Sequence, residues 1–176
     1  SRVDAWTTCA ACNQFFSGPF MLALSKWRSK AANKKGATWY DKCLALRFSG
    51  IALGLVKRPQ ESLAMLLQAQ QILAENDPDG LAARFWLELA YSVATKHIWL
   101  KNYTKAAVLL DNCAALSARL NGKTSSKTLY LVMWRAKSDW YKTPDDETLA
   151  VALDTSCDAL EALIAEVGPD HFKTLR

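Results

Sequence analysis

The sequence predicts an all-α protein in which about eight helices form antiparallel hairpins stacked one on another. Apolar residues recur at spacings of three and four through most of the chain, as they do along one face of a helix. The β-branched residues are scattered among Ala, Leu, Lys and Glu, so no segment has the alternating pattern of a strand. A third observation is a set of small residues that recurs every 44 positions.

These small residues occupy three positions of the repeat, which we call registers, and each register occurs in three copies. The registers are Gly50, Ala94 and Ser138; Ser62, Ala106 and Ala150; and Ala69, Cys113 and Cys157. Small side chains let two helix backbones approach closely, so we expect these positions at helix contacts. The spacing predicts one helical-repeat domain over 1–176, with a degenerate N-terminal hairpin at 1–37 and repeats at 38–80, 81–126 and 127–170.

The first half of the chain predicts two hairpins. Residues 1–16 can form a helix, which Ser17-Gly18-Pro19 ends. The next helix is expected over 20–34, with Phe20, Leu24 and Trp27 on its buried face. Thr38 is expected to cap a helix that ends at Arg58-Pro59, and the return helix runs over 60–75.

The second half repeats this plan. The segment from Asn76 to Gly80 predicts a turn, followed by helices at 81–100 and 103–120. Only Lys101-Asn102 separates these two helices, so they are expected to be antiparallel neighbours. A turn is expected at 121–126, and Ser125 or Ser126 is expected to cap the helix that follows it and runs to Tyr141. A last helix is expected over 147–167.

Composition favours a protein of the cytoplasm or nucleus. The chain has five cysteines, an odd number, and two of them fall on small-residue positions, which favours a reducing compartment. No apolar run of about 18 residues occurs, so neither a membrane span nor a secretory signal is expected. Because the chain lacks an initiating Met and stops where a further hairpin would begin, it looks like a segment of a longer protein.

Positive charge is concentrated at the N-terminal end. Residues 1–60 carry ten Lys and Arg against two Asp, a balance of +8, whereas residues 61–176 carry twelve against fifteen, a balance of −3. A basic cluster surrounds Trp27 and consists of Lys26, Arg28, Lys30, Lys34 and Lys35. Such a cluster can contact phosphates while an aromatic ring stacks on a base, or it can be a solvated helix end. An alternative function is therefore a nucleic-acid-binding or nucleoprotein scaffold.

The pattern Trp134-x3-Ser138-x2-Tyr141 followed by Ala150 resembles the tetratricopeptide repeat. Its period of 44 residues, where that family has about 34, is similar to the longer variety found in kinesin light chains. The resemblance implies a short right-handed α-solenoid in which the first helix of each hairpin lines a concave groove. The groove residues that it implies here are Arg47, Tyr91, Thr95, Trp99, Arg135, Asp139 and Lys142.

No pattern in the sequence indicates catalysis. Cys9-x-x-Cys12 lacks a second half for zinc, and no phosphate loop or triad order occurs. His97 stands where Leu53 and Tyr141 stand in the other hairpins, which favours a packing role. Trp99 and Trp140 lie off the core stripes and are expected either to anchor a partner or to cover a neighbouring repeat.

We therefore expect no catalytic, cofactor-binding or metal-binding residue. The sequence predicts a non-enzymatic protein-interaction scaffold that binds a peptide or helix, acidic in character, in its groove. Self-association through an open C-terminal end is a further expectation, because the last helix has no following hairpin to cover it.

Overall fold

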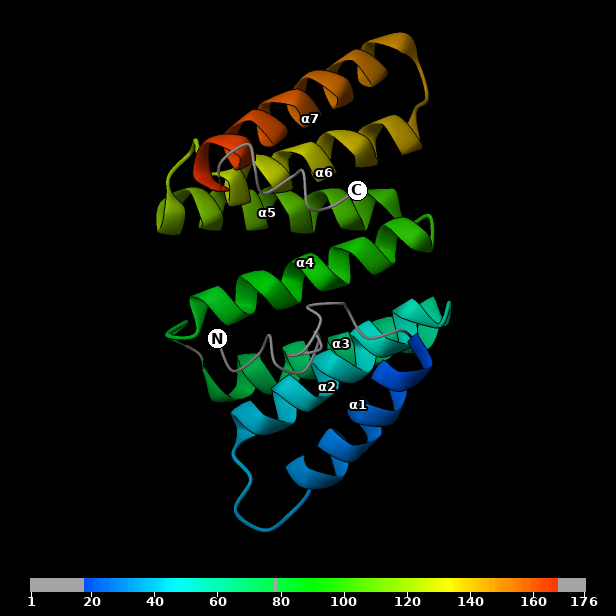
Figure 1. The fold of residues 1–176 in the computed structure, drawn as a ribbon, viewed down its shortest axis with the longest axis vertical. Helices are drawn as coiled ribbons and strands as arrows, with labels where there is room; N and C mark the ends of the chain where they lie inside the picture. Colours follow the sequence, from blue (N-terminus) through cyan, green and yellow to red (C-terminus); the bar gives the residue numbers. More distant parts are fainter. Residues whose placement is uncertain (1–17, 78, 168–176) are drawn as a thin grey trace. The chain divides into compact units, whose positions relative to one another are not determined.

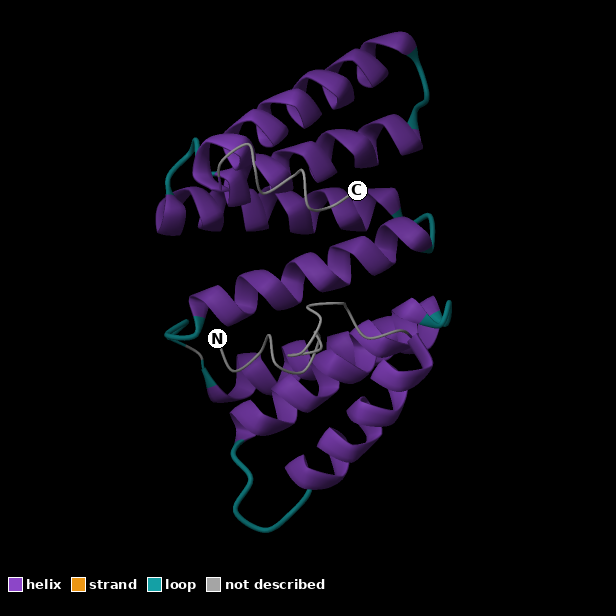
Figure 2. Cartoon of the chain, in the orientation of Figure 1, coloured by secondary structure: helices purple, strands orange, loops and turns teal. Residues whose placement is uncertain are grey.

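A computed structural model describes residues 18–77 and 79–167, which fold into α-helices joined by turns (Figure 1). Figure 2 shows helix and loop only, so the all-α prediction is confirmed for the described residues. Seven helices are described where about eight were predicted, and the helix predicted at 1–16 lies outside the described residues. The helices are α1 (Gly18–Ala32), α2 (Trp39–Leu55), α3 (Pro59–Asn76), α4 (Ala83–Trp99), α5 (Tyr103–Asn121), α6 (Ser126–Lys142) and α7 (Asp146–Val167).

Contacts divide the chain into two compact units, residues 1–96 and 97–176. In the first unit α1 packs on α2, and α2 packs on α3. In the second unit α5 packs on α6, and α6 packs on α7. The three helices named in each unit thus pack in sequence order, as their short connections require. Within the described ranges, none of the helices combines the length and the apolar character that crossing a bilayer demands.

The predicted caps set the helix starts. Thr38 and Asp41 form a reciprocal capping box, in which Asp41 N donates to Thr38 Oγ1 at 3.1 Å and Thr38 N donates to Asp41 Oδ2 at 3.0 Å. Ser125 caps α6 and receives the Thr128 N–H at 3.3 Å. Pro59 occupies the first position of α3, where its missing N–H removes no helical bond.

Gly50 lets α2 and α3 approach closely. A side-chain carbon at position 50 would lie 2.7 Å from Cγ of the fully buried Leu66 and 3.1 Å from the backbone oxygen of Ser62. The Ser62 hydroxyl donates a hydrogen bond to the Gly50 carbonyl at 2.5 Å. Neither neighbour can retreat, because one is core and the other is backbone. The small-residue prediction is therefore confirmed at this contact.

Seven of the nine predicted small positions are buried, namely Gly50, Ser62, Ala69, Ala94, Ala106, Cys113 and Ser138. The prediction is wrong for Ala150 and Cys157, which are exposed. They lie on the side of α7 that faces away from α6. The side toward α6 buries Ala152 and Ala159 instead, at 5% and 7% exposure. α7 therefore presents to α6 a face different from the one that the 44-residue register predicts.

The turns after α2 and α4 have the same backbone geometry. Lys57 and Lys101, 44 residues apart in the sequence, both adopt left-handed backbone angles, with φ of 60° and 61°. In each turn a backbone N–H reaches back five residues to close the end of the helix. These bonds run from Arg58 N to Leu53 O at 3.0 Å and from Asn102 N to His97 O at 2.8 Å.

α1 buries a face that differs from the predicted one. Met21 is 2% exposed and packs with Phe48 and Ala52 of α2. Phe20 and Trp27, predicted to be buried, are 49% and 58% exposed. The prediction fails because apolar residues occupy both sides of this short helix, so periodicity alone does not select one side.

Candidate functional site

The residues predicted to line a groove divide between the two units. The first unit holds Arg47, Tyr91 and Thr95, and the second holds Trp99, Arg135, Asp139 and Lys142. The Arg47 side chain is only 14% exposed, and its Nη2 lies 3.0 Å from Glu88 Oε2. Burial lowers the pKa of Arg47, and the Glu88 carboxylate opposes that shift. Arg47 is thus largely enclosed beside a carboxylate of its own chain.

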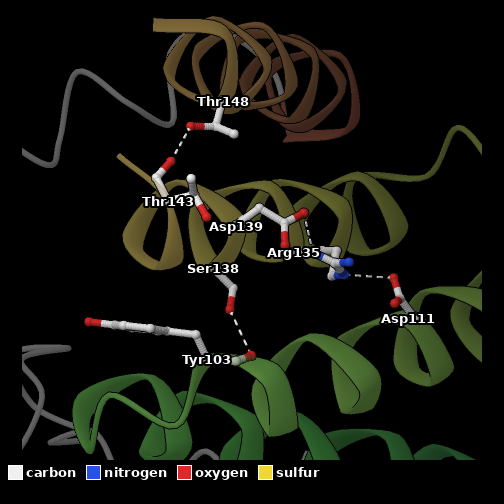
Figure 3. Close-up of polar contacts among 7 residues, drawn as sticks. All are labelled: Tyr103, Asp111, Arg135, Ser138, Asp139, Thr143 and Thr148. Atoms are coloured by element: carbon white, nitrogen blue, oxygen red, sulfur yellow. Dashed lines mark hydrogen bonds and ion pairs between the residues drawn. The ribbon is translucent and has the colours of Figure 1, made fainter. Parts of the chain in front are cut away.

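In the second unit Arg135 lies between two carboxylates (Figure 3). Its Nε donates to Asp111 Oδ1 of α5 at 2.9 Å, and its Nη1 forms an ion pair with Asp139 one turn along α6. Nearby, the Ser138 hydroxyl donates to the Tyr103 backbone oxygen at 3.3 Å and joins α6 to α5. The structure therefore brings Arg135 and Asp139 together as an internal pair, which leaves Arg135 less able to bind a carboxylate from a partner.

The remaining groove residues differ in exposure. Trp99 is 51% exposed, as its anchor interpretation requires, and Lys142 at the end of α6 is also exposed. Tyr91 and Thr95 are half-buried, and the Thr95 hydroxyl donates to the Ser92 backbone oxygen at 2.8 Å. Exposure alone thus leaves Trp99 and Lys142 as the more accessible members of the predicted set.

The predicted basic cluster lies on α1 and the turn that follows it. Lys26, Lys30, Lys34 and Lys35 are exposed, whereas the Arg28 guanidinium sits 4.3 Å from the centre of the Phe48 ring. Burial lowers the pKa of Arg28, and the Asp41 carboxylate opposes that shift. A hollow of about 320 Å³ beside the cluster is lined by Trp27, Arg28, Ala31, Lys34, Lys35 and Asp41 among others. Four of the five basic residues are therefore exposed along α1 and the turn after it, whereas Arg28 is half-buried against Phe48.

α7 carries a second exposed surface, to which the sequence analysis assigned no residues. Apolar side chains follow one another along its outer side at alternating spacings of three and four, as on one face of a helix. Leu153 and Leu160 are 57% and 50% exposed, and Ile164 is 36% exposed. The row consists of Ala150, Leu153, Cys157, Leu160 and Ile164, which we call the outer row of α7.

A line of carboxylates borders the outer row. α7 contains six acidic residues and no Lys, Arg or His. Four of the six follow one flank of the outer row at helical spacing, and these are Glu147, Asp154, Asp158 and Glu161. All four are exposed. The outer side of α7 is therefore both apolar and strongly negative.

Hydrogen bonds join the C-terminal end of α7 to α6 and its N-terminal end to the turn between the two helices. At the C-terminal end, the Glu166 carboxylate accepts from Ser126 N at 3.0 Å and from Ser126 Oγ at 2.5 Å. The Ser126 hydroxyl and then its N–H lower the pKa of Glu166. At the other end, the Thr148 hydroxyl donates to the Thr143 backbone oxygen at 2.8 Å (Figure 3). The outer row is thus presented by a helix that is hydrogen-bonded to α6 at one end and to the connecting turn at the other.

The sequence itself indicates this exposed side of α7, but the 44-residue spacing of small residues predicts that the same side is buried. Residues 146–167 have apolar positions on two sides, one that packs on α6 and one that stays exposed, and they contain no basic residue. The sequence predicts an unfinished side on the last helix without identifying the residues that form it. The rotation of α7 on α6, which only packing determines, selects the side that remains exposed.

No group of three or more His, Cys, Asp or Glu side chains among the described residues could hold a metal ion. Burial raises the pKa of the Cys43 thiol to about 11 and that of Cys113 to about 12. Both thiols therefore stay protonated near neutral pH and are poor nucleophiles. Cys9 and Cys12 lie outside the described residues.

Comparison with known proteins found no family model, no curated protein and no solved structure that matches this chain.

Proposed function

We propose that this chain is a non-enzymatic protein-interaction scaffold and that its docking surface is the outer row of α7 with the acidic flank beside it. The observation that carries this proposal is the exposure of Leu153 and Leu160, at 57% and 50%, in the middle of a regular apolar row. Contiguous apolar surface bordered by polar residues commonly marks an interaction site. The partner that fits is a basic amphipathic helix, because a helix can lay its apolar face along the row and its cations against the flank.

The geometry of α7 suits such a partner. A helix of 22 residues is about 33 Å long, so several turns of a partner helix can lie against it. Burying the exposed half of each leucine would contribute roughly 1 kcal/mol per residue. Because α6 already holds α7 in place, the partner would not have to order it first.

A synthetic peptide tests this proposal. The probe is a labelled Leu/Lys peptide of about 21 residues with helical spacing, and fluorescence anisotropy measures its affinity for the whole chain. Replacing Leu153→Ser together with Leu160→Ser should weaken binding at least about tenfold, since two apolar contacts are lost. Circular dichroism should show unchanged helix content, because both side chains are exposed.

Two controls sharpen the result. The paired change Leu55→Ser and Leu67→Ser removes leucines of similar exposure, 53% and 44%, from α2 and α3 and should alter affinity less than about twofold. A peptide of the same composition without helical spacing should bind weakly to every variant. Equal binding of the probe to the α7 variant and to the unmodified chain would overturn the proposal.

A second candidate function, a scaffold that binds nucleic acid, rests on the basic cluster of α1. The observation that favours it is the 58% exposure of Trp27 beside Lys34 and Lys35, which line the same hollow. A stacked base and neighbouring phosphates would match this arrangement. The affinity of a single-stranded oligonucleotide should then fall steeply with added salt, and Lys34→Glu with Lys35→Glu should abolish binding. A salt-insensitive or unchanged affinity would remove this candidate and leave the α7 surface unaffected.

A further inference from the structure

We infer that the occupant of the α7 surface is the α1 helix of a second copy of this chain, so that copies associate head to tail. This inference rests on the proposed function, because it names the partner of the same docking surface. Charge complementarity and the pattern of exposed apolar residues on the two helices support it.

A second α7 is a poor occupant. Two α7 helices side by side would bring the four flanking carboxylates of one helix near those of the other, with no basic residue on either helix to compensate them. Like charges that face each other at short range are destabilising, and partial burial strengthens the repulsion. The occupant must therefore carry positive charge along an apolar face.

α1 meets both requirements. Residues 18–37 contain five Lys and Arg and no acidic residue. Its outer side has an apolar row at spacings of four, three and four, namely Phe20, Leu24, Trp27 and Ala31. Phe20 and Trp27 remain about half exposed, at 49% and 58%. Among the described helices, α1 packs chiefly on α2, so its outer side faces away from that contact.

Lys30 follows Trp27 by three residues and so lies beside it on the helix surface, and Lys26 lies one turn before Lys30; both lysines are exposed. When the apolar rows of α1 and α7 meet, these cations can face the carboxylates that flank α7, such as Asp154 and Asp158. The contact joins two different surfaces, so in a pair one copy would retain an unused α7 surface and the other an unused α1 surface. Such heterologous association extends beyond a dimer unless a ring closes.

Sedimentation velocity of the whole chain tests this inference. At about 0.05 M salt the average mass should rise above that of the monomer as protein concentration increases, and at about 0.5 M salt the rise should be much smaller because the Debye length shortens about threefold. The variant Leu153→Ser with Leu160→Ser disables α7, and the variant Lys26→Glu with Lys30→Glu disables α1. Each variant alone should remain a monomer.

Mixing the two variants provides the decisive measurement. One retains an intact α1 and the other an intact α7, so the mixture should form a one-to-one pair and stop at the mass of a dimer. Dimerisation of the α1 variant alone would mean that α7 pairs with itself and would overturn the inference. A chain that stays monomeric at low salt would also overturn it, whereas binding of the Leu/Lys peptide to that same chain would leave the proposed function intact.

Discussion

His97 is a titratable side chain at a position that holds an apolar residue in the preceding hairpin. Leu53, which lies 44 residues earlier, is 8% exposed, and His97 is 8% exposed as well. Among the described residues no group hydrogen-bonds to Nδ1 of His97. Burial lowers the pKa of His97, and the nearby Lys105 lowers it further. The neutral imidazole is therefore the form that the folded chain accommodates, as a packing role requires.

This depressed pKa predicts that stability depends on pH. The unfolded chain takes up the proton at a higher pH, near 6.5, than the folded chain does, so stability is complete above about 6.5 and declines as the pH falls through the folded pKa. His97→Leu should remove much of the decline between about pH 7 and about pH 5. Urea unfolding at a series of pH values measures how the free energy of unfolding depends on pH.

The variant Lys105→Gln supplies a graded comparison, because it removes only the second cause of the shift. Its stability should depend on pH less than that of the unmodified chain and more than that of His97→Leu. Identical pH dependence in all three proteins would show that His97 does not titrate differently on folding.

At the scale of the element, the turns after α2 and α4 have the same backbone conformation. Each ends a helix with a lysine in the left-handed region, where a side chain is strained and glycine is not. The third hairpin instead uses Asp145, whose Oδ1 accepts from Thr148 N at 2.7 Å at the start of α7. The first two connections are therefore copies in conformation, and the third is different.

Because glycine adopts this conformation without strain, Lys57→Gly should raise the free energy of unfolding by about 0.5–1 kcal/mol. Chemical denaturation of the whole chain measures the change. The same substitution at Lys42, an exposed helical position in α2, should lower stability by about 1 kcal/mol. A loss of stability at both positions would contradict the strain that we assign to Lys57.

Sequence reasoning succeeded where local chemistry determines the element. The helix starts at Thr38 and Ser125 depend on side chains that bond to nearby N–H groups, so the cap residues could be identified before the fold. It failed on α1, where Trp27 was predicted to be buried, because apolar residues on both sides made two rotations equally compatible with the pattern. The exposed side of α7 could not be chosen for the same reason, since the contact with α6 fixes it.

At the scale of the whole molecule, charge is distributed unevenly along the chain. Residues 1–60 have ten basic residues against two acidic ones, and residues 61–176 have twelve against fifteen. The contrast is sharper between the first and last described helices, because α1 has no acidic residue and α7 has no basic one. The net charge of +5 conceals this separation. Attraction between copies, as proposed above, would follow from the separation and not from the net value.

The hydrogen bonds that join Glu166 to Ser126 and Thr148 to Thr143 also bear on how fast a partner can bind. A helix that is already folded and anchored needs no slow ordering step after collision. The encounter rate is then governed by diffusion and by long-range attraction to the carboxylates, and it slows as ionic strength rises. The lifetime of the bound state depends instead on the leucines, which act only at short range.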